Sequence, residues 1–379
     1  MMVRNVPGIY KGHAARLTYN ASLDGVRTIA IVFVLLFHTQ RPDGNVLLSG
    51  GFIGVELFFV LSGYLITALL LREHDTYGGI SIRAFYIRRA LRLFPALWLF
   101  LLTATVYVAL QSDRTHAEQV RSGIIATFFY VSNWIAVRYD NPFYFLNHTW
   151  SLAIEEQFYL LWPWMLIVAV KRLSPGKMLV VTALMVLAAV VLQGYYFHVS
   201  GTFLRSYAGT DSRAAGLLIG AMLAMLLRSG RGIPGARYIS FLGALSLFSL
   251  AVIAVFAEYD RRYMYFGVLT VVSICSATLI LALETDRRSG VSRFLGLSPL
   301  RYVGKISYGL YLWHFPVFQI VHEYRDDFGP IAAGFLSWAI SLAIATISYF
   351  CVERWFLSRK QQLASGSTRP GAPSSSSLK

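Results

Sequence analysis

Cysteine and charge are both scarce in this chain of 379 residues. It has only two cysteines, Cys275 and Cys351, with no CxxC pair and no His/Cys cluster, which excludes a disulfide framework and argues against a zinc site. Only 14% of the residues are charged, whereas a soluble domain has about 25%. We therefore expect no bound metal and too little polar surface to face water on all sides.

Apolar residues are in surplus instead. They make up 56% of the chain, and the mean hydropathy is +0.55. Runs of about 20 apolar residues recur, which is typical of membrane-spanning helices. The eleven apolar segments are 26–40, 51–71, 94–110, 123–137, 151–170, 178–197, 213–227, 238–257, 264–283, 302–321 and 330–352. No small-residue cleavage site follows the first, so we interpret it as a retained helix and not a signal peptide.

The distribution of positive charge predicts the topology. Lys and Arg outnumber Asp and Glu by 34 to 19, but they lie in short loops between apolar runs, which argues against nucleic-acid binding and follows the positive-inside rule. If 123–137 does not cross the membrane, 24 Lys and Arg fall on one side and eight on the other. We therefore predict an all-α integral membrane protein with about ten spans, cytoplasmic termini and one re-entrant or interfacial segment at about 123–137.

Composition also divides the chain into three parts. Residues 1–22 are a polar cytoplasmic lead, and residues 23–356 are the membrane domain. Residues 357–379 are rich in Gly, Pro and Ser, which predicts a disordered cytoplasmic tail. All candidates for chemistry therefore lie in the membrane domain.

Arg27 and His38 are the first such candidates, because ionisable side chains at membrane depth are costly and usually functional. They lie eleven residues apart, which places them on one helix face and about 16 Å apart along its axis. Such a face could hold an anionic donor at its inner end and a proton-transfer group at its outer end. A snorkelling arginine and an interfacial histidine explain the spacing equally well.

The second apolar run contains Glu56 near its start. A lone carboxylate in a membrane needs a partner, for which His38 and Arg27 are candidates. A water-exposed carboxylate at the interface is the alternative interpretation.

Three arginines follow at the inner surface. Arg88, Arg89 and Arg92 lie within about one helical turn. Guanidinium groups suit phosphates, and a coenzyme A donor carries several. From the residues alone, topology-setting charge beside anionic lipid is the better explanation.

A polar cluster occurs in NHTWSLAIEEQF. If this stretch is helical, His148, Ser151 and Glu155 share a face, with Trp150 beside them. A histidine and a carboxylate could orient and deprotonate a hydroxyl. A satisfied polar cluster at the interface is the alternative.

Two later groups complete the candidates. Asp211 and Arg213 begin a span, and we expect them to form an ion pair with each other rather than to contact a substrate. The segment ISYGLYLWHFP places Tyr308, Tyr311 and His314 within two helical turns. These side chains could line a carbohydrate site or form an aromatic belt.

Six of these segments, taken in order, resemble blocks of the acyltransferase-3 family of bacterial membrane acyltransferases. They are LDGVRTIAIVFVLLFHT, GGFIGVELFFVLSGYLIT, FYIRRALRLFPALW, HTWSLAIEEQFYLLWP, DSRAAGLLIGAMLA and YVGKISYGLYLWHFPV. The resemblance covers about residues 20–352. It implies O-acylation, usually O-acetylation, of surface or secreted carbohydrates and some antibiotics. Acyl-CoA is the implied donor, as a co-substrate and not a permanently bound cofactor.

The resemblance also implies a function for residues whose role their spacing leaves undecided. The family's Arg-x10-His element falls on Arg27 and His38, and its RRxxR element falls on residues 88–92. Members often have Asp where this chain has Glu56, so the carboxylate is kept but its reach differs. Many members carry a C-terminal extracytoplasmic hydrolase-like domain, and we expect no such domain after residue 352.

We therefore predict an O-acetyltransferase of the bacterial cytoplasmic membrane that moves an acetyl group from acetyl-CoA to a hydroxyl of O-antigen, exopolysaccharide or a lipid-linked glycan. The predicted catalytic residues are His38, Arg27, Glu56, Glu155 and His148; the donor-binding residues are Arg88, Arg89 and Arg92; and the substrate-binding residues are Trp150, Ser151, Tyr308, Tyr311 and His314.

The predicted partners are the carbohydrate acceptor, membrane lipid, and either a second copy or glycan-assembly proteins. Alternatives are acylation of a macrolide or another small secreted metabolite, a transporter of glycan precursors and a non-catalytic scaffold; the sequence shows no internal repeat of the transporter kind.

Overall fold

The computed structural model describes residues 19–40, 45–140, 142–200, 202–230, 235–324 and 329–359. Most of the predicted lead and nearly all of the predicted tail lie outside these residues. The helices, in chain order, are α1 (Ala21–His38), η1 (Gly51–Ile53), α2 (Gly54–Tyr77), α3 (Ile82–Leu110), α4 (Arg114–Phe128), α5 (Ser132–Tyr139), η2 (Tyr144–Thr149), α6 (Trp150–Arg172), α7 (Pro175–Val199), α8 (Leu204–Ala208), α9 (Thr210–Arg228), α10 (Ala236–Phe256), η3 (Met264–Val268), α11 (Leu269–Thr285), α12 (Gly290–Leu295), α13 (Ser298–Glu323), α15 (Pro330–Ser348) and η4 (Tyr349–Glu353).

The predicted all-helical, multi-pass architecture is confirmed. Within the described residues, nine helical segments are long and apolar enough to cross a membrane: Ala21–His38, Gly51–Tyr77, Ile82–Leu110, Tyr144–Arg172, Pro175–Val199, Thr210–Arg228, Arg237–Phe256, Met264–Thr285 and Pro330–Arg359. The helix α13 has 26 residues but is not among them, because His314, Gln319 and His322 lower its hydropathy. Ten crossings require α13 to span as well, and this count stays a prediction.

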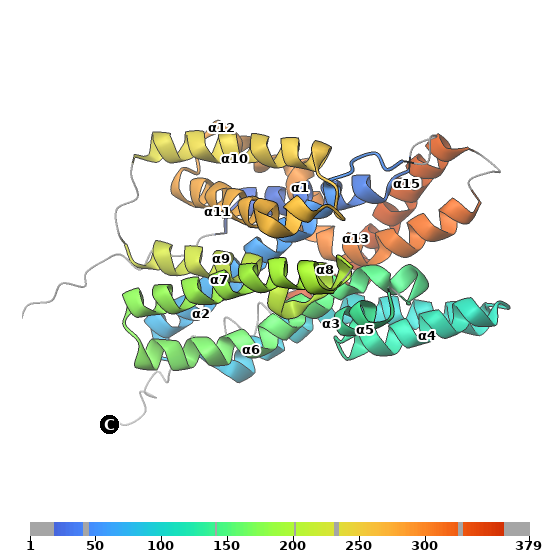
Figure 1. Ribbon diagram of the computed structural model, residues 1–379, viewed down its shortest axis with the longest axis horizontal. Helices are drawn as coiled ribbons and strands as arrows, with labels where there is room; N and C mark the ends of the chain where they lie inside the picture. Colours follow the sequence, from blue (N-terminus) through green and yellow to red (C-terminus); the bar gives the residue numbers. More distant parts are fainter. Residues whose placement is uncertain are drawn as a thin grey trace, which may run out of the picture.

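The segment predicted not to cross the membrane is divided between two short helices. The helices α4 and α5 have 15 and 8 residues, and neither is among the candidate spans. Between them Tyr130 has a φ of 53°, which breaks the helix. Asp113 caps the start of α4, and its pKa lies below the ordinary value because the carboxylate accepts hydrogen bonds from the backbone N–H groups of His116 and Thr115. Figure 1 shows α4 and α5 together at one end of the bundle.

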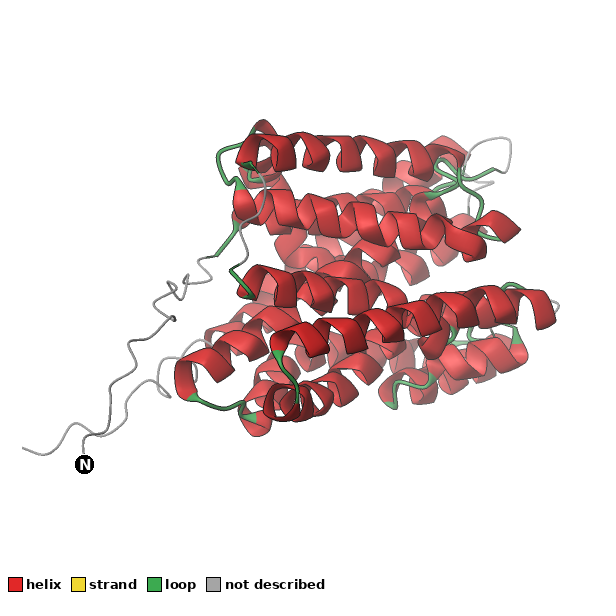
Figure 2. Ribbon diagram, turned by 60° about the vertical axis from the view of Figure 1, so that its left-hand side comes forward, coloured by secondary structure: helices red, strands yellow, loops and turns green. Residues whose placement is uncertain are grey.

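The remaining helices pack side by side in one bundle, which Figures 1 and 2 show from two directions. The helix α1 packs against α2 and α13, α2 against α9, and α9 against α7. Glycines allow the closest approaches. Gly63 of α2 faces the backbone of Leu217, and Gly220 of α9 faces the backbone of Val60. Small residues bring helices together in this way in membranes, where no hydrophobic effect drives their association. The α2–α9 pair therefore depends on both glycines.

We expect Gly63→Ala to destabilise the protein, because the new methyl group would overlap the carbonyl oxygen of Leu217. Overpacking of this kind costs about 1–3 kcal/mol, which a thermal-unfolding assay in detergent would detect as a lower Tm. Gly176→Ala is the matched control, since no atom lies within 4 Å of a Cβ placed there. Equal melting temperatures for the two variants would contradict the packing argument.

Candidate functional site

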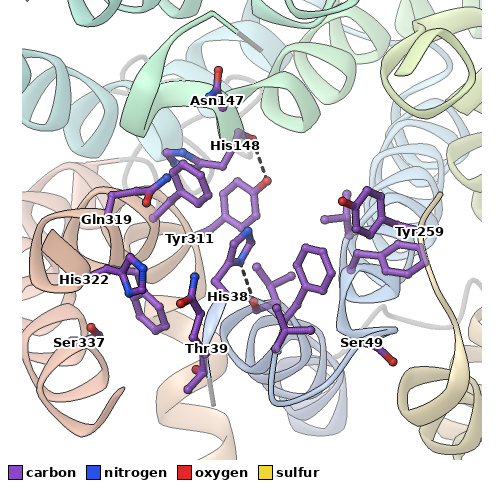
Figure 3. A pocket seen from close by; sticks show the side chains of 18 of the residues that line it. His38, Thr39, Ser49, Asn147, His148, Tyr259, Tyr311, Gln319, His322 and Ser337 are labelled. Carbon is purple, nitrogen blue, oxygen red and sulfur yellow. Dashed lines mark hydrogen bonds between the residues drawn. The ribbon is translucent and has the colours of Figure 1, made fainter. Parts of the chain in front are cut away.

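A cavity of about 670 Å³ opens at the end of the bundle where α1 ends and α15 begins. His38, His148, Trp150 and Tyr311 are among the residues that line it, and aromatic side chains make up much of its wall. Figure 3 shows His38 near the centre with His148 and Tyr311 beside it and Tyr259 across the opening. Four residues that the sequence predicted as catalytic or substrate-binding therefore line one cavity.

The imidazole of His38 is held in one orientation by its own helix. Its Nδ1 lies 2.8 Å from the carbonyl oxygen of Val34, and because a carbonyl can only accept a hydrogen bond, Nδ1 must carry the proton. In the neutral ring this leaves a lone pair on Nε2. The arrangement suits a general base or a nucleophile, since His38 also lines the cavity.

Two further histidines lie close to His38. The ring centroids of His38 and His314 are 5.1 Å apart, and those of His314 and His148 are 5.5 Å apart. His314 is fully buried and its Nδ1 lies 2.7 Å from the carbonyl oxygen of Tyr311. His148 is 4% exposed, and neither of its ring nitrogens has a hydrogen-bond partner. Within the described residues, these side chains do not form a group that could hold a metal ion.

A hydroxyl network supports the wall beside His148. The Tyr311 hydroxyl donates to the carbonyl oxygen of His148 at 2.9 Å, and Ser151 makes a short hydrogen bond with the same hydroxyl. Ser151 and Tyr311 were predicted to bind substrate. In the structure they hold the η2–α6 junction against α13, so their contact with a substrate stays a prediction.

A cluster of arginines lies toward the other end of the bundle. Arg27 forms an ion pair with Asp24 at 2.6 Å, and the charges of Arg92 and Arg89 act on it. Arg89 stacks on Tyr159, with 4.8 Å between the guanidinium carbon and the ring centroid. Helices α1, α3 and α6 thus bring Arg27 together with Arg89 and Arg92, which belong to the two elements that the resemblance indicated. The spacing of residues along one helix could not have predicted this arrangement.

The three arginines predicted to bind the donor have different partners. Arg88 forms an ion pair with Glu73 at 2.8 Å, whereas Arg89 and Arg92 interact with Arg27 and with Glu155. Glu155 accepts a hydrogen bond of 2.6 Å from Ser62. These contacts place the Glu155 carboxylate with the arginines, and its predicted catalytic role stays a prediction.

The partner predicted for Glu56 was wrong. Its carboxylate contacts neither His38 nor Arg27 but pairs with Arg213 of α9 at 2.9 Å and accepts a 2.5 Å hydrogen bond from Ser273 of α11. Both charged side chains are at least 97% buried. The Arg213 guanidinium also faces the rings of Trp150 and Tyr207, at 5.9 and 5.5 Å, and both rings line the cavity.

The ion pair expected between Asp211 and Arg213 is also absent from the described residues. Asp211 instead accepts two hydrogen bonds from Arg205 of α8, at 2.9 and 2.7 Å. On a helix, residues two apart point in different directions, so Asp211 faces α8 while Arg213 faces the bundle interior. The spacing itself could have indicated that the two side chains do not meet.

One predicted residue lies apart from the cavity, and two important residues were missed. Trp150 lines the cavity, whereas Tyr308 is partly buried elsewhere, with an unpartnered hydroxyl. Sequence reasoning missed Tyr207, whose ring packs against that of Trp150 with 4.6 Å between the centroids, and Ser273. Neither residue stands out in the sequence, because a tyrosine or a serine is common in an apolar segment. The one signal in the sequence for the partner of Glu56 was Arg213, a charged residue at membrane depth.

These features define a multi-pass membrane protein with a cavity lined by histidines and aromatic residues and an arginine cluster within the bundle. The chain belongs to the acyltransferase domain family, whose model matches residues 20–352. This confirms the family that the six sequence blocks indicated.

Curated relatives agree with the family assignment. The chain is 35% identical over 372 residues to a Staphylococcus aureus (strain MSSA476) protein with a provisional O-acetyltransferase name, covering 94% of this chain and 60% of the relative. It is 35% identical over 355 residues to the peptidoglycan O-acetyltransferase OatA of Listeria monocytogenes, covering 88% and 55%. The chain thus spans little more than half the length of these relatives. No solved structure matches it.

We expect Arg213→Met to destabilise the fold strongly, because it leaves the Glu56 carboxylate buried without its ion-pair partner. Breaking a buried pair costs about 3–5 kcal/mol, which thermal unfolding would report. The double variant Glu56→Gln/Arg213→Met should recover part of the loss. If Glu56→Gln instead left the Tm unchanged and only lowered turnover, Glu56 would have the catalytic role first predicted for it.

Proposed function

We propose that this chain is an O-acetyltransferase that moves an acetyl group from acetyl-CoA to a hydroxyl of a cell-wall or other surface glycan. The proposal places it in the bacterial cytoplasmic membrane, with α13 as a tenth span and both termini in the cytoplasm. The positive-inside count supports this orientation. The cavity then opens on the outer side, where a surface glycan would be available.

The observation that carries the proposal is the orientation of His38. Its Nδ1 is engaged by Val34, so Nε2 is the nitrogen left for chemistry in a cavity large enough for a sugar. Membership of the acyltransferase domain family supplies the reaction class. A transporter or scaffold would not require a histidine held as one tautomer.

The reaction can then be written in balanced steps. His38 Nε2 accepts the proton of the acceptor hydroxyl while its oxygen attacks the thioester carbonyl carbon. The C–S bond breaks, the acetyl group stays on the acceptor oxygen, and the departing thiolate receives the proton. In the alternative route Nε2 itself carries the acetyl group between donor and acceptor. The His314 ring lies 5.1 Å from that of His38 and the His148 ring lies 5.5 Å from that of His314, so both form part of the surroundings of the reacting histidine.

The donor would approach from the arginine side. Its phosphates would contact Arg88, Arg89 and Arg92 near the cytoplasmic surface, and its slim pantetheine arm would pass Arg27 toward His38. The cluster of Arg27, Arg89 and Arg92 supports this route, because guanidinium groups suit phosphates. The carboxylate of Glu155 balances part of this charge when no donor is bound.

Peptidoglycan is the acceptor that the relatives favour. The Listeria monocytogenes protein is named for peptidoglycan O-acetylation, as is a provisionally named Bacillus subtilis relative that is 34% identical over 351 residues. Mass spectrometry of glycans from strains with and without the gene tests the assignment. The expected result is loss of an acetyl increment from a cell-wall glycan; loss from a small secreted metabolite would favour the alternative acceptor.

We expect His38→Ala to lose nearly all transfer while the protein stays folded, because general-base assistance contributes about 10²- to 10⁴-fold. Transfer of radiolabelled acetyl to glycan in membranes measures the loss. His116→Ala is the matched control, since His116 is exposed and is not among the residues that line the cavity. Retained transfer by a well-expressed His38→Ala variant would remove His38 from the mechanism.

Arg89→Ala should raise the acetyl-CoA concentration needed for half-maximal rate, because the donor loses a phosphate contact. Arg88→Ala should have the smaller effect, since Glu73 already holds that guanidinium. A donor titration compares the variants at constant acceptor. An unchanged titration for Arg89→Ala would contradict its role in binding phosphate.

A further inference from the structure

The outer cavity differs in charge from the rest of the chain. The chain carries 34 Lys and Arg against 19 Asp and Glu, but the described residues that line the cavity include two carboxylates, Glu258 and Asp260, and no Lys or Arg. The loops at this end of the bundle do contain arginines. Among the described lining residues, the lack of basic side chains is therefore a property of the cavity and not of its surroundings.

The nearby arginines are held by other groups. Arg205 gives two hydrogen bonds to Asp211, although its neighbour Leu204 lines the cavity. Arg261 pairs with Glu258 at 2.6 Å, but both side chains are about half exposed, and an exposed pair of this kind contributes little. Asp260 forms no ion pair with the described residues, and it also borders a second, smaller cavity together with Asp140. Arg262, beside Asp260, lies over the ring of Phe266, with 4.7 Å between the guanidinium carbon and the ring centroid. Among the described residues, Asp260 is therefore a lining carboxylate without an ion-pair partner.

The interior offers neutral partners. His148 is 96% buried and lines the cavity. Neither ring nitrogen has a hydrogen-bond partner by geometry, although the backbone of Leu312 and of Phe145 acts on the ring. Gln319 lies beside it (Figure 3), and Asn147 and Ser337 add further amide and hydroxyl groups to the lining. Such groups bind the hydroxyls and acetamido groups of a sugar. A carboxylate or phosphate placed here would meet no cationic partner on the described lining, and burying an unpaired charge is costly.

We propose that this cavity accepts a neutral or amino-bearing sugar and rejects a sugar whose reacting unit carries a carboxylate or phosphate. The inference rests on the proposed function, because it assumes that the acceptor enters here. It goes further by naming the charge class of the acceptor and Asp260 as a residue that sets it. Like-charge repulsion by Asp260 and the lack of a cation among the described lining residues act in the same direction.

Three oligosaccharides with one β-1,4-linked glucan backbone test the proposal: cellotetraose, its 2-amino analogue and its 6-carboxyl analogue. Calorimetry measures binding of each to the full chain in lipid nanodiscs without an acyl donor. We expect the neutral and amino compounds to bind, and the carboxylated one to bind more weakly by tenfold or more, on the order of the effect of one unscreened charge pair. This preference should shrink when ionic strength is raised from about 0.01 M to about 0.3 M, because screening shortens the reach of the carboxylates.

Asp260→Asn should reduce the preference for the amino over the carboxyl compound by several-fold. Glu118→Gln is the matched control, because Glu118 is an exposed carboxylate of α4 that is not among the lining residues. Equal binding of the carboxyl and amino compounds, or a preference that Asp260→Asn does not change, would overturn the proposal. No binding by any of the three would also overturn it. The proposed acetyl transfer would survive these results, because the His38 variant tests it separately.

Discussion

The whole structure depends on one constraint: a charged group at membrane depth must find its partner inside the bundle. Glu56, Arg213 and Ser273 meet this constraint by joining α2, α9 and α11. Their contact places the guanidinium behind Trp150 and Tyr207, which form one wall of the cavity. The ion pair therefore positions the aromatic wall without itself lying among the residues that line the cavity.

A second set of buried charges forms a separate centre. Arg27, Arg89 and Arg92 gather from α1 and α3, and Glu155 joins them from α6. The helix α1 connects this centre with the cavity, since Arg27 lies in its first half and His38 is its last residue. A donor with phosphates and an acceptor with hydroxyls would need different surroundings. Under the proposed function, the arginine cluster would receive the donor, the cavity would receive the acceptor, and α1 would link the two sites.

Much of the fold could be predicted from the sequence, because a chain that crosses a membrane can adopt few backbone structures. Long apolar runs became helices, and the charge count indicated that 123–137 does not span, where the structure has two short helices. The sequence also singled out His38, His148, Tyr311 and Trp150, which line one cavity. The pairing of charges was less predictable. Glu56 and Arg213 are far apart in the chain, and only the close approach of α2 and α9 at Gly63 and Gly220 brings their side chains together.

Amino-acid order alone determined the membrane location, the family and the helical face shared by Arg27 and His38, because these depend on composition, ordered motifs and the period of one helix. Tertiary structure decided which charges pair, that three histidines meet, and that the described lining of the cavity lacks lysine and arginine. Those properties arise between helices. They depend on how each helix is rotated about its axis. That rotation is set by packing against neighbouring helices, and no single segment of the sequence encodes it.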